Sequence, residues 1–273
     1  MNYLAGLNPM IHYTEFKHAT SKKWITFIHG AGGSSAIWYK QLKAFKEEFN
    51  VLLIDLRGHG RSKEKMTEVL KRYTFDFIGN EVIEVLDHLK IKQSHFIGIS
   101  LGTVIIRELS ERFPERISSQ IMGGAILQLN FRGQLLMRLG VLLKSVVPYI
   151  FLYKFFAWII MPRPKHKESR VLFVREAKKL YQNEFKRWFT LASEINPLLK
   201  LFRTQAPSIP TLYIMGAEDY MFLPAVRKQC DMHDLSSLMV IPNCGHVVNV
   251  EQPLTFNIEA ISFIHRNLDG RAA

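Results

Sequence analysis

Cysteine is scarce in this chain of 273 residues, and its scarcity excludes two classes of protein. The two cysteines, Cys230 and Cys244, are too few for a disulfide scaffold, and nothing pairs them with histidines at the spacing of a zinc finger. The first ten residues contain no basic segment followed by an apolar run, so a secretory signal is not predicted. We therefore expect a cytoplasmic protein with reduced thiols and without a metal site.

Low-complexity tracts and internal repeats are missing as well. Hydrophobic residues make up 48% of the chain and charged residues 22%, with a mean hydropathy of +0.01. This is the composition of a globular protein, which excludes the collagen-like and disordered classes. The length suggests one large domain, or one domain that carries an insertion.

Acidic residues are scarce in one part of the chain. The formal net charge is +12, and residues 131–200 contain fourteen Lys or Arg against four Glu, which leaves the rest of the chain close to neutral. Such an excess of positive charge attracts nucleic acid, an anionic membrane surface or an acidic substrate. Nucleic acid is disfavoured as a partner, because the basic residues are interleaved with aliphatic ones and no recognition motif is present.

Apolar runs alternate with helical patterns along most of the chain. We predict six strands, at residues 24–29, 51–55, 94–99, 117–122, 211–215 and 238–241. After the third run, Leu101, Val104, Ile105 and Leu109 repeat at helical spacing until Pro114. Buried strands that alternate with helices indicate a parallel sheet in an α/β fold.

The alternation stops between residues 126 and 206. This stretch is basic, strongly apolar and helical in pattern, and it contains no strand signal. It is followed by a proline-containing linker at residues 206–210. We predict a helical insertion at 126–206, while residues 1–125 and 207–273 form the core domain.

The most specific motif is Gly98-Ile99-Ser100-Leu101-Gly102. It matches the nucleophile elbow G-x-S-x-G, and it lies between a predicted strand and a predicted helix, where that turn belongs. Such a turn holds the serine in a strained conformation, and its glycines leave room for neighbouring elements. We expect Ser100 to be a nucleophile and the backbone N–H of Leu101, at a helix N-terminus, to stabilise an oxyanion.

A second glycine-rich turn, His29-Gly30-Ala31-Gly32-Gly33, follows the first predicted strand. Glycines at this place allow backbone N–H groups to approach a substrate, and we assign the N–H of Ala31 as the second oxyanion donor. A phosphate loop is excluded because no Gly-Lys-Ser/Thr follows, and a dinucleotide site because G-x-G-x-x-G is absent here.

A general base and its acid are expected late in the chain. His246 follows a predicted strand by a short loop, and Asp219 lies just beyond the strand at 211–215. The order Ser100, Asp219, His246 is that of a nucleophile, an acid and a base in α/β-hydrolases. Glu218 is an alternative acid, because it directly precedes Asp219.

Together these pieces resemble the α/β-hydrolase superfamily from about residue 24 to residue 268. The motifs that carry the resemblance are His29-Gly30, Asp55-Leu56-Arg57-Gly58-His59-Gly60-Arg61-Ser62, the elbow at Ser100, Asp219 after Gly216, and Gly245-His246. The resemblance implies a mostly parallel central sheet flanked by helices, with residues 126–206 forming a helical cap over the active site. A triad that forms and hydrolyses an acyl-enzyme with water needs no cofactor, and none is expected.

The segment at residues 141–161 is the most apolar part of the chain. It is long enough to span a bilayer, but Pro148 and Lys154 interrupt it, and a lysine at mid-span costs roughly 3 kcal/mol, so spanning is disfavoured. It either packs on the sheet and lines an acyl pocket, or lies on an anionic membrane whose headgroups bind the basic cluster at 163–179. Each alternative implies a lipophilic substrate.

These features predict a serine hydrolase that cleaves carboxylic esters of lipophilic acyl groups, of the carboxylesterase or monoacylglycerol-lipase type. A carbon–carbon bond hydrolase, a thioesterase, and a signalling regulator that binds a lipophilic ligand with slow turnover remain alternatives. Serine at the elbow disfavours dehalogenase and epoxide hydrolase chemistry, which in this superfamily uses a carboxylate nucleophile. The oligomeric state is not predicted.

Overall fold

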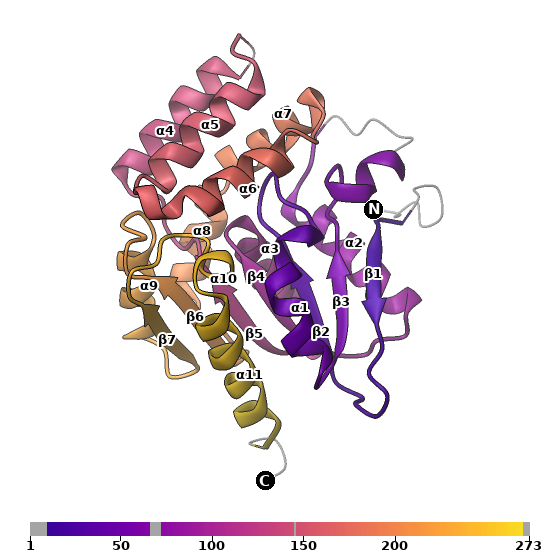
Figure 1. Ribbon diagram of the computed structural model, residues 1–273. Coiled ribbons are helices and arrows are strands. Elements are labelled where there is room, and N and C mark those ends of the chain that lie inside the picture. The colour runs from indigo at the N-terminus through magenta and orange to yellow at the C-terminus, as the bar shows by residue number, and fades with distance from the viewer. Residues whose placement is uncertain (1–9, 66–71, 145, 270–273) are drawn as a thin grey trace.

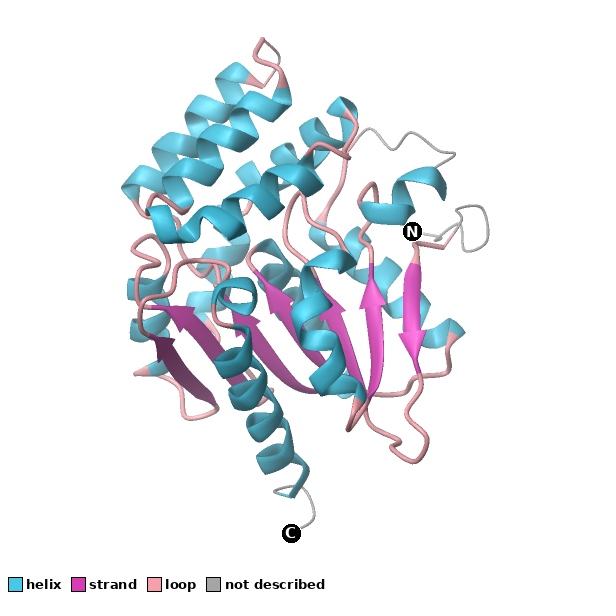
Figure 2. Ribbon diagram, in the orientation of Figure 1, coloured by secondary structure: helices cyan, strands magenta, loops and turns pink. Residues whose placement is uncertain are grey.

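The computed structural model describes residues 10–65, 72–144 and 146–269 (Figure 1). In this part of the chain a central sheet lies between two layers of helices, and further helices cover one end of the sheet (Figure 2). The predicted α/β-hydrolase fold class is therefore confirmed.

The described residues form a seven-stranded sheet in the order β1-β3-β2-β4-β5-β6-β7. The strands are β1 (Tyr13–Phe16), β2 (Trp24–Ile28), β3 (Asn50–Ile54), β4 (Ser94–Ile99), β5 (Ile117–Gly123), β6 (Thr211–Gly216) and β7 (Ser236–Ile241). Only β1 runs antiparallel to its neighbour, and the remaining pairs are parallel. The carboxyl ends of the six parallel strands consequently meet at one edge, where such folds place their ligands.

Strand β1 was not predicted from the sequence. Its four residues are all half-buried, so they carry neither the continuous apolar run nor the clear alternation of a core strand. It pairs Tyr13 with Ile54 at the edge of the sheet. This segment is a strand because it pairs with β3, and not because of its own composition.

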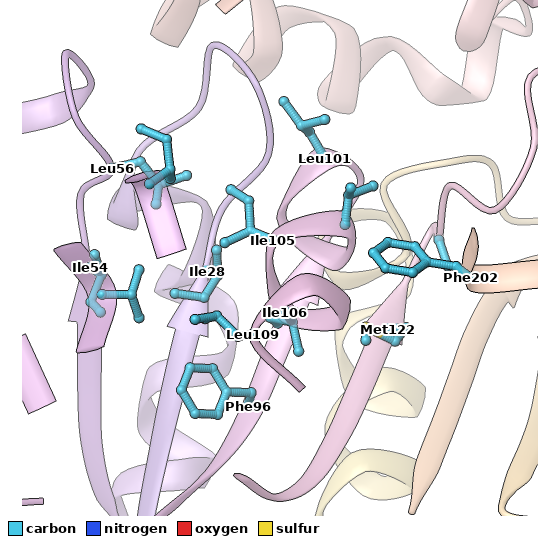
Figure 3. Packing of buried hydrophobic residues seen from close by; sticks show 14 of the residues in the cluster. Ile28, Ile54, Leu56, Phe96, Leu101, Ile105, Ile106, Leu109, Met122 and Phe202 are labelled. Atoms are coloured by element: carbon cyan, nitrogen blue, oxygen red, sulfur yellow. The ribbon is translucent and has the colours of Figure 1, made fainter. Parts of the chain in front are cut away.

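Two hydrophobic clusters lie on opposite faces of the sheet. Successive residues of β4 point to opposite sides, so Phe96 belongs to the cluster under α2 and α3, and Ile97 to the cluster under α1 and α11. Figure 3 shows the first cluster, in which Ile105 and Leu109 of α3 lie close to Ile28 of β2. The described helices outside residues 126–206 are α1 (Tyr39–Lys46), α2 (Phe75–His88), α3 (Leu101–Arg112), α9 (Leu223–Cys230), α10 (Val248–Glu251) and α11 (Pro253–Asp269), with short 3-10 helices at Ser35–Trp38, Gly60–Lys65 and Pro114–Arg116. A further 3-10 helix, Pro164–His166, lies inside that range.

Five helices lie between β5 and β6 in the described residues. They are α4 (Phe131–Leu143), α5 (Tyr149–Ile160), α6 (Lys167–Ala177), α7 (Gln182–Ser193) and α8 (Asn196–Thr204). The first four cover the carboxyl edge of the sheet (Figure 1). Helix α8 instead buries Leu199 and Phe202 in the same cluster as Met122 of β5, so this end of the insertion packs on a sheet face. The division into a core and a separate cap stays a prediction.

The apolar segment at 141–161 is divided between two helices. Helix α4 ends at Leu143, and α5 begins after Pro148, whose ring cannot continue a helix from the preceding turn. Within the described ranges, no helix combines the length and the apolar character that crossing a membrane requires.

Candidate active site

Ser100 sits on a strained turn between β4 and α3. Its backbone has φ 55° and ψ −124°, a region that residues with a side chain rarely adopt. A Cβ at Gly98 would lie 2.6 Å from Ile106 Cδ1, and one at Gly102 would lie 2.4 Å from the Ile28 carbonyl oxygen. Both flanking glycines are therefore required by close contacts, as the motif predicts.

The structure brings the three predicted triad residues together. His246 Nε2 lies 2.9 Å from Ser100 Oγ, and His246 Nδ1 lies 2.8 Å from Asp219 Oδ2. Asp219 and His246 are buried, and Asp219 Oδ1 also accepts a hydrogen bond of 3.3 Å from the Phe222 N–H. The arrangement can pass the Ser100 proton to His246 while Asp219 orients the ring.

Glu218, the alternative acid, contacts other partners. Its Oε2 lies 3.0 Å from His166 Nε2, and its Oε1 pairs with Arg163 and Lys165. All three partners lie in the segment between α5 and α6. Asp219 is thus the carboxylate that contacts His246, and Glu218 ties the inserted segment to the loop after β6.

The two predicted oxyanion donors flank the serine. Neither the Ala31 nor the Leu101 N–H has an acceptor among the described residues, and Leu101 is the first residue of α3, where N–H groups lack helical partners. A Cβ at Gly30 would lie 3.0 Å from Ser100 Cβ, so glycine lets this turn approach the serine closely. Both residues line the cavity in front of Ser100. Their amides can hold a negatively charged oxygen there.

Two buried histidines hold the glycine-rich turn at residues 29–33 in place. The Leu56 N–H donates to His29 Nε2 over 3.1 Å, and the Gly32 N–H donates to His59 Nε2 over 2.9 Å. The Nδ1–H of His29 donates to the Gly30 carbonyl oxygen, and the Nδ1–H of His59 donates to the Arg57 carbonyl oxygen. These bonds require neutral rings. Burial lowers the pKa of both histidines, that of His59 to about 3.

The stretch at residues 55–62 holds further loops around the site. Asp55 accepts hydrogen bonds from the N–H of Ser35, at 2.7 Å, and of Arg61, at 3.0 Å. The Trp188 indole of α7 donates to the Arg57 carbonyl over 3.0 Å. The polar residues of this stretch thus shape the loops around the site, and α7 is anchored to them.

A mainly apolar cavity opens in front of Ser100. The inserted helices supply much of its wall, including Leu136 of α4, Phe156 of α5 and Trp188 of α7. Glu176 of α6 is the one acidic residue in the described lining, and it accepts from Ser34 Oγ and Lys179 Nζ, each at 2.7 Å. The sequence does not reveal these lining residues, because nothing in their spacing shows which side of each helix faces the serine.

Neither cysteine has the environment of a nucleophile. Cys244 is fully buried, and burial raises the pKa of its thiol; burial also raises the pKa of Cys230 to about 12. In the described part of the chain, no group of three or more His, Cys, Asp or Glu is placed to hold a metal ion.

Known proteins are similar to this chain in sequence. Residues 23–139 match the profile of the alpha/beta hydrolase fold family. The chain is 27% identical to 3-oxoadipate enol-lactonase 2 of Acinetobacter baylyi over 266 residues, 94% of this chain and 95% of the relative. It is 24% identical to an uncharacterised carboxylesterase of Bacillus subtilis over 251 residues, 88% of this chain and 79% of the relative.

Solved structures agree in fold. A hydrolase from Oleispira antarctica matches with a TM-score of 0.80 at 20% identity, over 94% of this chain and 95% of that one. A mostly parallel sheet with a strained serine after its fourth strand defines the α/β-hydrolase class. The chain thus has the α/β-hydrolase fold, and residues 23–139 match the model of that family.

Proposed function

We propose that this protein is a serine hydrolase that cleaves carboxylic esters of lipophilic acyl groups. The observation that carries the proposal is the continuous hydrogen-bonded chain from Ser100 through His246 to Asp219, next to a cavity. The names of two relatives, an enol-lactonase and a carboxylesterase, support hydrolysis of an ester bond.

The acylation step follows from the geometry of the triad. His246 Nε2 takes the proton from Ser100 Oγ as the oxygen attacks the ester carbonyl. The Ala31 and Leu101 amides stabilise the tetrahedral oxyanion, and each such donor contributes about 3 kcal/mol. Asp219 stabilises the imidazolium that forms. Protonated His246 then gives its proton to the departing alcohol, which leaves an acyl-serine.

The second half of the reaction uses the same groups. His246 removes a proton from a water molecule, the hydroxide attacks the acyl-serine, and the carboxylic acid leaves as Ser100 recovers its proton. Apart from the substrate and water, every group in these steps belongs to the chain, which is why we propose a reaction without a cofactor.

The substrate class follows from the cavity. Its wall is built from aliphatic and aromatic side chains of α4, α5 and α7, which favour an acyl chain over a charged group. We therefore propose a lipophilic acyl group, with residues 126–206 acting as a cap that covers it. A cytoplasmic protein in contact with an anionic membrane is part of the same proposal, since esters of this kind partition into lipid.

Reaction with a fluorophosphonate tests the nucleophile. The wild-type protein should be labelled at Ser100, and Ser100→Ala should lose both the label and hydrolysis of p-nitrophenyl esters. A Ser34→Ala variant, at a serine near the cavity, serves as the matched control and should still be labelled. Labelling of the Ser100→Ala protein would assign the nucleophile elsewhere.

A substrate panel tests the bond that is cleaved. Esters and thioesters of the same acyl chains, from two to twelve carbons, should show ester hydrolysis that rises with chain length. Faster turnover of the thioesters would favour the thioesterase alternative. Labelling at Ser100 without steady-state turnover of any ester would favour the ligand-binding regulator.

A further inference from the structure

Helices α4 and α5 carry large apolar side chains on their outer faces. The α4–α5 face consists of Phe131, Leu135 and Leu142 of α4 and Phe151, Phe155 and Trp158 of α5, all of them exposed. On each helix they recur at spacings that place them on one side. The exposure reaches 79% for Phe131, 73% for Leu142 and 62% for Trp158. The two helices lie at the outer end of the molecule (Figure 1), and they touch where a Cβ at Gly140 of α4 would lie 2.8 Å from the Phe156 ring of α5.

The packing of the protein does not require this face to be apolar. The opposite sides of the same helices bury Leu136, Leu152 and Phe156, and two of these, Leu136 and Phe156, line the cavity in front of Ser100. One side of each helix thus closes the cavity and the other meets solvent. A group of large exposed apolar side chains of this kind marks an interaction site in a folded protein.

The charge of the region limits what covers it. Residues 126–167 contain no Asp or Glu, while Arg138 and Lys154 are exposed among the apolar side chains. Lys154 Nζ lies 5.6 Å from the centre of the Phe151 ring. A second copy of the chain on this face would bring lysines and arginines together without a carboxylate to neutralise them. Anionic headgroups above an apolar layer complement both features.

The basic cluster at 163–179 is less suited to bind headgroups than the sequence suggests. Arg163 and Lys165 pair with Glu218, and Lys179 Nζ lies 2.7 Å from Glu176 Oε1. These cations already face carboxylates of the protein. On α4 and α5, Arg138 and Lys154 lie among exposed apolar side chains and have no carboxylate partner within the described ranges.

We propose that the α4–α5 face docks on an anionic phospholipid membrane, with the two helices lying flat on its surface. Helices of 13 and 12 residues reach only about 20 Å, too short to span the hydrocarbon layer. The part of this inference that concerns substrate delivery rests on the proposed function. With the helices on lipid, the wall of the cavity adjoins the phase in which a lipophilic ester is dissolved.

Sedimentation with vesicles tests the docking. Wild-type protein should bind vesicles of phosphatidylcholine and phosphatidylserine at least tenfold more tightly than pure phosphatidylcholine, and binding should weaken in high salt. Phe131→Glu combined with Leu142→Glu should reduce binding at least tenfold. Leu254→Glu combined with Ile258→Glu, which changes equally exposed apolar residues on α11, is the control and should bind like the wild type.

Two further measurements separate this proposal from the catalytic one. Brominated lipids should quench the fluorescence of Trp158, because Trp38 and Trp188 are buried in the protein and Trp24 lies at the start of β2, at the end of the sheet away from α4 and α5. The Ser100→Ala protein should bind vesicles normally, and the Phe131→Glu, Leu142→Glu variant should keep its thermal stability and its hydrolysis of a short soluble ester. Absence of wild-type binding, or undiminished binding of this variant, would overturn the docking proposal whatever the enzyme assays give; concentration-dependent self-association in its place would assign the face to a second copy.

Discussion

The loops around Ser100 and the helices that cover them are built in opposite ways. Around the serine, polar groups are buried and paired: His29 and His59 each hold a backbone N–H, and Asp55 holds two. On α4 and α5, large apolar side chains are exposed and few polar bonds anchor the outer surface. Proton transfer needs atoms fixed within a fraction of an ångström, whereas an acyl chain needs only apolar surface of suitable shape.

The largest effect on activity is expected from a change among the buried polar groups around Ser100. Asp219→Asn should lower kcat by about 10⁴-fold, because the amide cannot stabilise the His246 imidazolium and favours the wrong ring tautomer. Steady-state hydrolysis of a p-nitrophenyl ester measures the effect.

The matched control for that experiment is Glu218→Gln. Glu218 binds His166 and not His246, so its exchange should lower kcat far less than that of Asp219. If both variants lost the same activity, the assignment of Asp219 rather than Glu218 as the acid that acts on His246 would be wrong.

An effect of intermediate size is expected in the pH dependence of the free energy of unfolding. Burial lowers the pKa of His59 from 6.5 to about 3, so the unfolded chain binds more protons than the folded one between these values. The contribution that neutral His59 makes to the stability of the fold is therefore complete above about pH 6.5, and it is lost as the pH falls toward 3. The free energy of unfolding should fall by up to about 1.4 kcal/mol per pH unit and per such histidine in this window, measured by urea denaturation.

His59→Gln should flatten that dependence, since the glutamine oxygen can accept from the Gly32 N–H without titrating. His88→Gln, at an exposed histidine of α2, is the control and should leave the slope as it is. An unchanged slope in the His59 variant would mean that acid destabilises the protein at another place.

The smallest effect is expected in the cavity wall. Leu136→Ala enlarges the cavity and should shift the preferred acyl chain toward greater length, with a several-fold change in kcat/KM between chains, since one methylene group contributes about 0.8 kcal/mol. Leu135→Ala, at the exposed neighbour on α4, should change no preference toward soluble esters. Equal shifts in both variants would contradict the assignment of inner and outer faces.

The sequence alone predicted the parts of the site that local sterics impose. Gly98 and Gly102 flank Ser100 because a strained turn packs against neighbouring backbone, and that constraint is visible in five consecutive residues. The six core strands were predicted because each is a short run of mostly apolar residues. Strand β1 was missed because its pairing partner, and not its composition, makes it a strand.

Other features depended on how distant segments pack. The choice between Glu218 and Asp219 rests on one residue, and only the folded loops show which carboxylate meets His246 and which meets His166. The same holds for the cap, where helical periodicity predicted helices but not which side of α4 or α5 faces the serine.

The sequence by itself determined the fold class and the strained serine, because both follow from backbone sterics and apolar periodicity over a few residues. The order of the serine's partners came from the resemblance to the α/β-hydrolases. Only the tertiary structure decided which carboxylate contacts the imidazole, which side chains wall the cavity and which apolar residues stay exposed. Those features depend on distances between segments far apart in the chain, and such distances exist only once the helices have packed on the sheet.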